Sequence, residues 1–313
     1  MLKVLDSKEY LECFLHAPRP GAENIMAFYD HRIGYIGRNP SLCALPVDDR
    51  LVHRGDGVFE TLKYAEGRIY QLDPHLERLK RSGQGIFLEL PCSLAELREM
   101  VLDLARAAQG KIGLIRILVG RGLGGFGVDP LDSAGPSLYM IAYGYHPKPE
   151  DFFEKGASAC RSGIPAKPAY LGRIKTVNYL PNALMKREAT LRGCDFPVCF
   201  DEAGFMAEGA VENICVVDEK GVLILPNFDQ VLPGTTVLRA AELIKEEISA
   251  VCRPLVEEEL FKAKEIIAVG TTIDAVGIVR YNAHAVGDGR PGPVALRMRE
   301  LLRKDFAENG VGF

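Results

Sequence analysis

The sequence predicts a protein built from two α/β domains. Three observations support this class: the chain has 313 residues, apolar patterns of strand and helix spacing alternate along it, and a proline-containing segment interrupts them at 146–150. A single hydrophobic core rarely grows beyond about 250–300 residues, and proline disfavours helix on its N-terminal side. We therefore expect an N-terminal α/β domain over 1–145, a linker over 146–153 and a C-terminal domain over 154–313.

The first half of the chain contains a strand pair followed by a helix. Residues 58–63 and 68–72 alternate β-branched or aromatic residues with polar ones around a Glu-Gly turn, which predicts a hairpin. Asp73 and Pro74 then favour a helix N-terminus. Arg78 should therefore lie just inside a helix that follows a strand.

A second helix and two further strands complete the N-terminal domain. Ser93 and Glu96 form a capping-box pattern before a helical pattern over 94–108. Apolar strand patterns over 112–119 and 138–143 flank a Gly-rich loop. In the second half, the patterns predict helices over 181–192 and 235–248, with short strands around Val198, Ile214 and Leu223.

Composition and charge narrow the class of function. The chain is 47% hydrophobic and 26% charged, as expected of a globular protein, and its net charge of −4 argues against nucleic acid as the main partner. No apolar run approaches the roughly 20 residues that cross a bilayer. The opening residues turn acidic before any signal-like apolar segment forms, so we expect a cytoplasmic protein without membrane contact. The eight cysteines include no C-x-x-C pair, so neither a metal site nor a disulfide framework is indicated.

Several weak signals together resemble the parts of a cofactor site. Lys175 precedes an aromatic turn and a helix start, and Glu208 lies just before an apolar strand. Two small-residue turns follow, at 232–236 before a helix and at 269–272 after a strand. Such turns present backbone N–H groups and hydroxyls to phosphate. An amine, an acid and a phosphate cradle are what pyridoxal phosphate chemistry requires.

The order of these elements resembles the fold-type IV (class IV) aminotransferases, a pyridoxal-phosphate family that includes branched-chain aminotransferases, D-amino acid aminotransferases and aminodeoxychorismate lyases. The resemblance runs from about Val52 to Gly292. Four blocks in family order carry it, namely VHRGDGVFET at 52–61, HLERL at 75–79, IKTVNYLPN at 174–182 and EGAVEN at 208–213. It implies a two-domain fold like that of D-amino acid aminotransferase, with a smaller N-terminal and a larger C-terminal domain.

The resemblance also implies a role for each site residue. Lys175 would form the Schiff base and carry the proton. Glu208 would face the pyridine nitrogen, and Arg78 would bind the phosphate. Thr235, Thr236 and Thr271 would complete the phosphate site, and Tyr179 would reach the phenolic oxygen of the cofactor.

The resemblance also implies which residues would bind the substrate. Arg116 interrupts an apolar run and needs water or an anion, and the resemblance places it where a substrate carboxylate would bind. Phe59 and Lys63 share a strand face with Thr61, and Thr272 would also contact substrate. Thr61 and Leu114 stand where branched-chain enzymes have glycine and tyrosine. Phe126 and Val128 stand where D-amino acid enzymes carry an Arg-x-His pair.

Three functions remain open at this point. The first is a ping-pong transaminase that moves an amino group between an amino acid, of branched-chain or D-amino acid class, and a 2-oxo acid. The second is a 4-amino-4-deoxychorismate lyase that releases pyruvate with the same Lys175. The third is a phosphate-binding protein without activity. Family members are usually homodimers, so we expect a homodimer.

Overall fold

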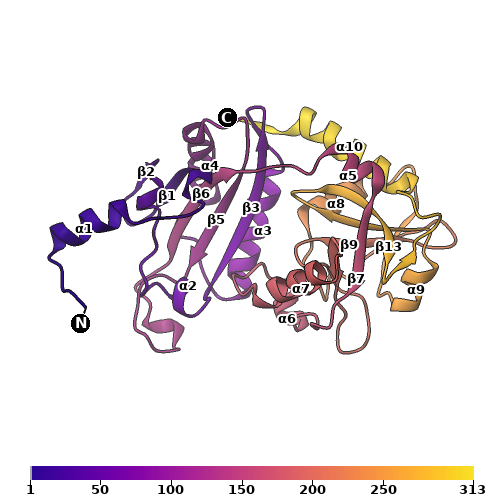
Figure 1. Cartoon of the computed structure of the whole chain (residues 1–313), viewed down its shortest axis with the longest axis horizontal. Helices are drawn as coiled ribbons and strands as arrows, with labels where there is room; N and C mark the ends of the chain where they lie inside the picture. The colour runs from indigo at the N-terminus through magenta and orange to yellow at the C-terminus, as the bar shows by residue number, and fades with distance from the viewer. Residues whose placement is uncertain (1) are drawn as a thin grey trace. The chain divides into compact units, whose positions relative to one another are not determined.

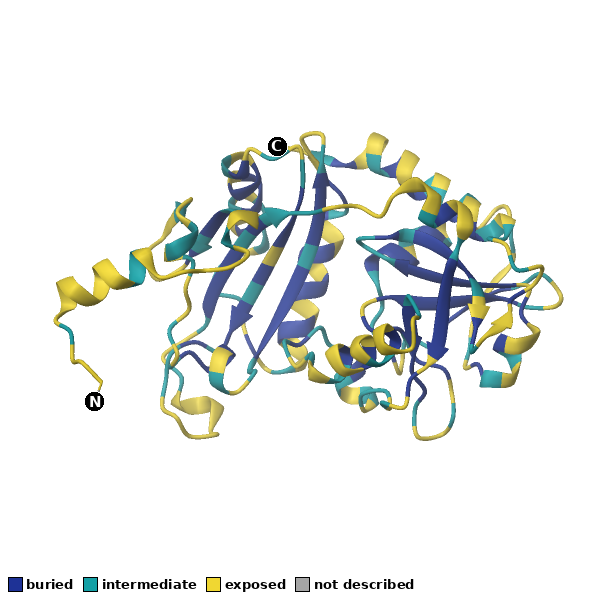
Figure 2. Cartoon of the chain, viewed as in Figure 1, coloured by how far each residue is buried: buried dark blue, intermediate teal, exposed yellow. Residues whose placement is uncertain are grey.

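In the computed structural model, residues 2–313 are described and divide into two compact units. Unit 1 contains residues up to 146 together with 311–313, and unit 2 contains 147–310 (Figure 1). Buried residues are concentrated on the strands of each unit (Figure 2). Each unit therefore has its own core.

Unit 1 is built on a seven-stranded antiparallel sheet in the order β15-β4-β3-β5-β6-β1-β2. The strands are β1 (Ile25–Asp30), β2 (Tyr35–Gly37), β3 (Gly57–Ala65), β4 (Arg68–Ile69), β5 (Ile112–Gly120), β6 (Ser137–Gly144) and β15 (Val311–Gly312). The helices are α1 (Ser7–His16), α2 (Arg50–His53), α3 (Leu72–Gly85) and α4 (Leu94–Ala108), with 3₁₀ turns η1 (Ala22–Asn24), η2 (Pro40–Leu42) and η3 (Pro130–Asp132). Helix α3 packs against β3, and α4 packs against β1 and β6.

Unit 2 is built on an eight-stranded mixed sheet in the order β11-β10-β9-β12-β13-β7-β8, with β14 paired to β13. The strands are β7 (Ala157–Arg161), β8 (Phe196–Val198), β9 (Asn213–Val217), β10 (Leu223–Leu225), β11 (Ala250–Cys252), β12 (Glu265–Gly270), β13 (Asp274–Tyr281) and β14 (His284–Ala285). The helices are α5 (Glu150–Lys155), α6 (Ala169–Gly172), α7 (Leu180–Leu191), α8 (Thr235–Ile244), α9 (Glu257–Lys262) and α10 (Pro293–Asn309). Helix α10 packs against α8 and β13.

Elements with a strong local signal lie where the sequence predicts them. Helix α4 has its capping box, in which Glu96 N–H donates to Ser93 Oγ at 3.2 Å and Ser93 N–H donates to the Glu96 carboxylate at 2.8 Å. Helix α7 covers the predicted segment 181–192 to within one residue at each end. The strands expected around Val198, Ile214 and Leu223 are β8, β9 and β10.

The start of α3 differs from the sequence expectation. The second hairpin strand ends at Ile69, and the helix begins at Leu72 after Gln71, which adopts a left-handed conformation with φ 51°. Asp73 is therefore inside the first turn and does not cap the helix. The reason is tertiary, since Leu72 is fully buried and the chain must bend before it.

Three further details differ from what the sequence predicts. Part of the expected linker is helical, since α5 begins at Glu150. Glu150 accepts hydrogen bonds from the Arg299 guanidinium at 2.6 and 2.8 Å, which anchors α5 on α10. The last residues pair with unit 1, since β15 aligns Val311 with Ile69 of β4. Helix α8 also ends at Ile244, short of the predicted residue 248.

Candidate functional site

Lys175 lies in the loop between α6 and α7 and contacts Tyr179, the residue immediately before α7. Its Nζ donates a hydrogen bond to Tyr179 Oη at 3.0 Å and lies 5.4 Å from the centre of the Tyr179 ring. Both side chains are half-buried. An amine that is partly shielded from solvent and hydrogen-bonded to a phenol can act as a nucleophile and as a proton carrier.

Glu208 places a carboxylate beside that amine. Burial raises the pKa of Glu208, while the positive charges of Lys167 and Lys175 and a hydrogen bond from the backbone N–H of Leu232 oppose the rise. The backbone of Glu208 is fixed, because its carbonyl accepts the N–H of Cys199 at 3.0 Å. The acid predicted from the sequence therefore shares its electrostatic environment with the predicted lysine.

The N-terminus of α8 supplies a site suited to an anion. Thr235 and Thr236 are buried in its first turn, and the N-cap residue, Gly234, has no side chain with which to cap the helix. Backbone N–H groups at an uncapped helix start attract phosphate. The turn that leads into the helix is held by Asn213, whose Nδ2 donates to the Leu232 carbonyl at 2.9 Å.

Asn213 also connects this helix start with the second predicted turn. It begins β9 and is aligned with Val269 near the end of β12, so the turn Gly270–Thr272 lies next to it. Gly234 fits against Asn213 only because it lacks a side chain, since a Cβ at that position would lie 2.0 Å from Asn213 Oδ1. Thr271 and the α8 N-terminus are therefore brought to the end of the unit 2 sheet where β9 begins and β12 finishes.

Unit 2 thus gathers six of the residues singled out from the sequence. The positive charge of Lys175 acts on the carboxylate of Glu208. Glu208 also forms a β-bridge with Asn213, which contacts the turn before α8 and lies next to the turn after β12. The six are Lys175, Tyr179, Glu208, Thr235, Thr236 and Thr271. Lys167, whose positive charge also acts on Glu208, is not among these six residues. The sequence does not indicate it, because it lies 41 positions before Glu208 and belongs to no motif.

Arg78 is in unit 1, on the inner side of α3, and is paired with a carboxylate. Its Nε and Nη2 donate to the Glu60 carboxylate at 2.7 and 2.8 Å, and His75 Nδ1 lies 2.7 Å from the same group. All three side chains are buried. Glu60 and His75 are not among the site residues predicted from the sequence, although a glutamate between Phe59 and Thr61 must face the opposite side of the strand.

Phe59, Lys63 and Arg116 lie on the other face of the unit 1 sheet. The register aligns Thr61 with Arg116, so Arg116 shares the face of Phe59 and Lys63. The Arg116 guanidinium lies 5.5 Å from the Phe59 ring centre and 5.8 Å from that of Tyr143. Arg116 is thus an exposed cation between two aromatic rings, and Tyr143 is a partner that the sequence did not indicate.

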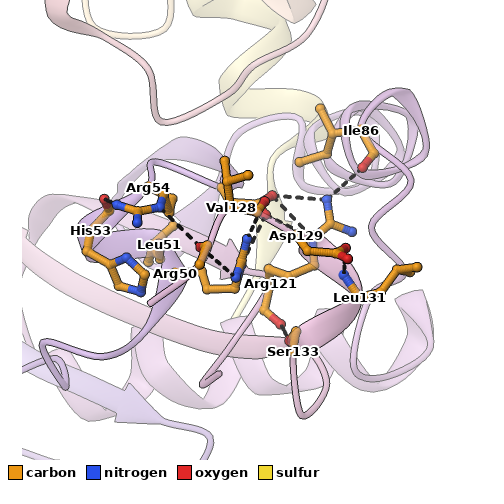
Figure 3. A network of polar contacts seen from close by, with 12 residues as sticks. Arg50, Leu51, His53, Arg54, Ile86, Arg121, Val128, Asp129, Leu131 and Ser133 are labelled. Atoms are coloured by element: carbon orange, nitrogen blue, oxygen red, sulfur yellow. Dashed lines mark hydrogen bonds and ion pairs between the residues drawn. The ribbon is translucent and has the colours of Figure 1, made fainter. Parts of the chain in front are cut away.

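The Gly-rich loop of unit 1 is tied down by arginines of and near α2 (Figure 3). Arg50 donates to the carbonyls of Val128 at 2.9 Å and Gly127 at 3.3 Å, and Arg54 donates to the carbonyl of Phe126. Phe126 and Val128 themselves remain exposed. The loop therefore presents apolar side chains outward from a backbone that is fixed by hydrogen bonds.

Comparisons with known proteins find relatives of this chain. A family model described as amino-transferase class IV matches residues 57–281. The chloroplastic D-amino-acid transaminase of Arabidopsis thaliana is 30% identical over 91% of this chain and 78% of its own length. A putative branched-chain-amino-acid aminotransferase of Methanocaldococcus jannaschii is 29% identical over 82% of this chain and 89% of its own.

Solved structures agree as well. The crystal structure of a branched-chain amino acid aminotransferase from Escherichia coli superimposes with a TM-score of 0.82 at 26% identity, covering 92% of this chain and 95% of that chain. Residues 2–313 contain no group of His, Cys, Asp and Glu side chains that could hold a metal ion. Within the same residues, no helix is long and apolar enough to cross a membrane.

Proposed function

Because the chain belongs to the class IV aminotransferase family, we propose that it transfers amino groups between an amino acid and a 2-oxo acid with Lys175 as its reactive amine. Membership confirms the fold, the enzyme class and the cofactor expected from the sequence, since class IV aminotransferases use pyridoxal 5'-phosphate. The related proteins are aminotransferases of D-amino acids and branched-chain amino acids, which favours transamination over the lyase reaction.

The observation that carries the proposal is that the Lys175 amine, bonded to Tyr179 Oη at 3.0 Å, acts electrostatically on the buried carboxylate of Glu208. Burial raises the pKa of Glu208 and the neighbouring ammonium groups oppose the rise, and a carboxylate facing the ring nitrogen would favour its protonated form. The N-terminus of α8 and the turn at Thr271 suit a phosphate. When bound there, pyridoxal phosphate supplies the electron sink that makes the Cα proton of an amino acid acidic.

The roles of the chain's own residues follow from this placement. Lys175 binds the cofactor through its amine and moves the proton, and Tyr179 orients Lys175 through the 3.0 Å hydrogen bond. Thr235, Thr236 and Thr271 hold the phosphate from unit 2. The role that the family resemblance gives to Arg78 is phosphate binding, and the orientation of its guanidinium is set by Glu60.

We propose that Phe59, Lys63, Arg116 and Thr272 bind the substrate, and that Arg116 binds its carboxylate. Arg116 presents an exposed guanidinium, which suits bidentate binding of a carboxylate. The amino acid is of branched-chain or D-amino acid class, because the relatives include a D-amino-acid transaminase and a putative branched-chain-amino-acid aminotransferase.

We further propose a cytoplasmic homodimer. The Gly-rich loop carries three strongly exposed apolar side chains, Phe126, Val128 and Leu131, and a second copy of the chain would remove them from water. Sedimentation velocity of the protein would test this assembly. A monomer at micromolar concentration would contradict it.

The test of the central proposal is covalent labelling. Borohydride reduction of the protein loaded with pyridoxal phosphate should fix the cofactor to one lysine, and Lys175→Ala should prevent this labelling whereas the matched surface change Lys220→Ala should not. Without an acceptor, a preferred D- or L-amino acid should convert the cofactor to pyridoxamine phosphate, whereas aminodeoxychorismate should not. Undiminished labelling of Lys175→Ala would refute the assignment of this lysine.

A further inference from the structure

Asn182 joins the segment that carries Lys175 to the segment that carries Glu208. It lies in the first turn of α7, three residues after Tyr179, whose Oη accepts the hydrogen bond from Lys175 Nζ. Asn182 Nδ2 donates to the carbonyl of Ala210 at 2.6 Å, and Ala210 is two residues after Glu208. One side-chain hydrogen bond therefore connects the segment of the amine with the segment of the acid.

This hydrogen bond is buried, and it is the one side-chain hydrogen bond that Asn182 makes within residues 2–313. Asn182 is 3% exposed and Ala210 is 1% exposed. Asn182 Oδ1 is also buried, and it has no hydrogen-bond partner among the same residues. An unpaired buried acceptor opposes folding, so packing alone does not account for an amide at this position. The contribution of Asn182 is the hydrogen bond that its Nδ2 donates.

The turn that accepts this hydrogen bond is closed by hydrogen bonds of its own. Gly209 N–H donates to the Glu212 carbonyl at 2.8 Å, and Val211 N–H donates to the Glu212 carboxylate at 3.1 Å. A Cβ on Gly209 would lie 2.5 Å from Glu212 Oε2, so the carboxylate fills the inside of the turn. A displacement of Ala210 is therefore passed on to Glu208, the residue immediately before Gly209.

The other end of the connection is the start of a helix. Ala183 N–H donates to the Tyr179 carbonyl at 2.9 Å, and Pro181 lies in the first turn, where its fixed φ favours the helix. Tyr179 and Asn182 therefore keep their positions relative to one another. Because Tyr179 holds the Lys175 amine by the 3.0 Å hydrogen bond, Asn182 relates the turn of the acid to the amine.

We propose that Asn182 is a positioning residue that sets where the Glu208 carboxylate lies relative to the Lys175 amine. The inference rests on the proposed function, in which these two groups act on one cofactor. Asn213 fixes the other end of the same turn, because its Nδ2 bonds the Leu232 carbonyl before α8. Two asparagines thus place the acid, one relative to the amine and the other relative to the phosphate-type turn. The donated hydrogen bond, and not the size of the side chain, is the property of Asn182 that matters.

The first measurement is amide hydrogen exchange of residues 208–213 in the cofactor-free protein, followed by mass spectrometry. Asn182→Ala should accelerate this exchange by about fivefold, as expected for the loss of one buried hydrogen bond. Asn182→Asp keeps the size of the side chain, and its carboxyl can donate to the Ala210 carbonyl when protonated but not when ionised. Compared with the wild type at each pH, its exchange should be equal at acid pH and faster once the introduced carboxyl ionises. The exposed control Asn309→Ala should leave the exchange unchanged.

The second measurement separates a positioning role from a purely structural one. In the protein loaded with pyridoxal phosphate, the rate constant of the amino acid half-reaction should fall by about fivefold or more in Asn182→Ala. Relative to the wild type at the same pH, it should recover in Asn182→Asp at acid pH and stay unchanged in Asn309→Ala. Borohydride should still fix the cofactor to Lys175 in every variant, because the amine itself is retained.

Unchanged exchange of 208–213 in both Asn182→Ala and ionised Asn182→Asp would overturn the proposal, as would faster exchange with an unchanged half-reaction. A wild-type protein that borohydride does not label at Lys175 would instead overturn the proposed function. Exchange in the cofactor-free protein would then still show whether Asn182 holds the turn of Glu208.

Discussion

Arg78 and Glu60 form a buried ion pair in which the guanidinium donates two hydrogen bonds to one carboxylate, at 2.7 and 2.8 Å. Glu60 is fully buried and Arg78 is 5% exposed. The pair joins the inner face of α3 to the central strand β3. A guanidinium held by two bonds to a fixed carboxylate keeps one orientation, which is what recognition of a phosphate requires.

Glu60→Gln should destabilise the protein by roughly 3 kcal/mol or more, because Arg78 would keep a buried charge without its partner. Burial opposes ionisation of Glu60, but Arg78 and His75 outweigh it and lower its pKa. The stabilisation is therefore complete above the ordinary glutamate pKa of about 4.3 and is lost as the pH falls below it. Urea unfolding at neutral and acidic pH measures both effects. The exposed neighbour Glu77→Gln is the control, and equal stabilities of the two variants at neutral pH would refute the pairing.

Arg50→Met should loosen the Gly-rich loop. Arg50 is 1% exposed and donates to three loop carbonyls, of Gly125, Gly127 and Val128 (Figure 3). A hydrogen bond to a charged donor contributes roughly 1.5–3 kcal/mol, so amide exchange of residues 125–128 should accelerate by about tenfold or more. Hydrogen exchange followed by mass spectrometry measures this. Arg106→Met, an exposed arginine of α4, should leave the loop unchanged. Protection of 125–128 that survives the loss of Arg50 would show that other contacts hold the loop.

The elements that the sequence predicts best are those whose determinants lie close together in the chain. The capping box of α4 needs only Ser93 and Glu96, three residues apart. The start of α3 depends instead on burial of Leu72, which its neighbours do not reveal, and so the local pattern predicts a cap at Asp73. The pairing of β15 with β4 joins residues more than 240 positions apart, which no local pattern encodes.

The same distinction applies to the candidate site. Lys175, Tyr179 and Glu208 lie in recognisable blocks and were predicted together. Lys167 was missed because its relation to Glu208 exists only in the folded chain. Glu60 lies inside the block 52–61, but its partner Arg78 is on a separate element, so the sequence does not reveal their ion pair. The alternation of β3 also places Glu60 on the face opposite Phe59.

The cysteines should react with alkylating reagents in an order set by burial. Burial raises the pKa of Cys160, Cys199 and Cys215 to about 12 in each case, whereas Cys13 and Cys252 are exposed. Because only the thiolate is nucleophilic, iodoacetamide near neutral pH should label the two exposed thiols first. Peptide mass spectrometry at increasing times measures the order, and urea-unfolded protein should label uniformly. Early labelling of Cys199, whose Sγ donates to the Glu208 carbonyl at 3.2 Å, would mean that the Glu208 segment opens readily.

Gly234→Ala should weaken pyridoxal phosphate binding through a clash with one identified side chain. Gly234 has φ −64° and ψ 131°, which any residue can adopt, so the constraint is space alone. The added Cβ would lie 2.0 Å from Asn213 Oδ1 and would displace the side chain that bonds the Leu232 carbonyl. Loss of that hydrogen bond, worth about 1 kcal/mol, together with movement of the α8 N-terminus, should weaken cofactor binding by roughly tenfold.

The origin of this effect can be isolated with a double-mutant cycle. In an Asn213→Ala background the obstructing oxygen is absent, so adding Gly234→Ala should change cofactor affinity little. Fluorescence titration of the cofactor into all four proteins measures the coupling. If Gly234→Ala weakens binding equally in both backgrounds, the clash with Asn213 is not the cause, and glycine at 234 must be required by the approach of the phosphate itself.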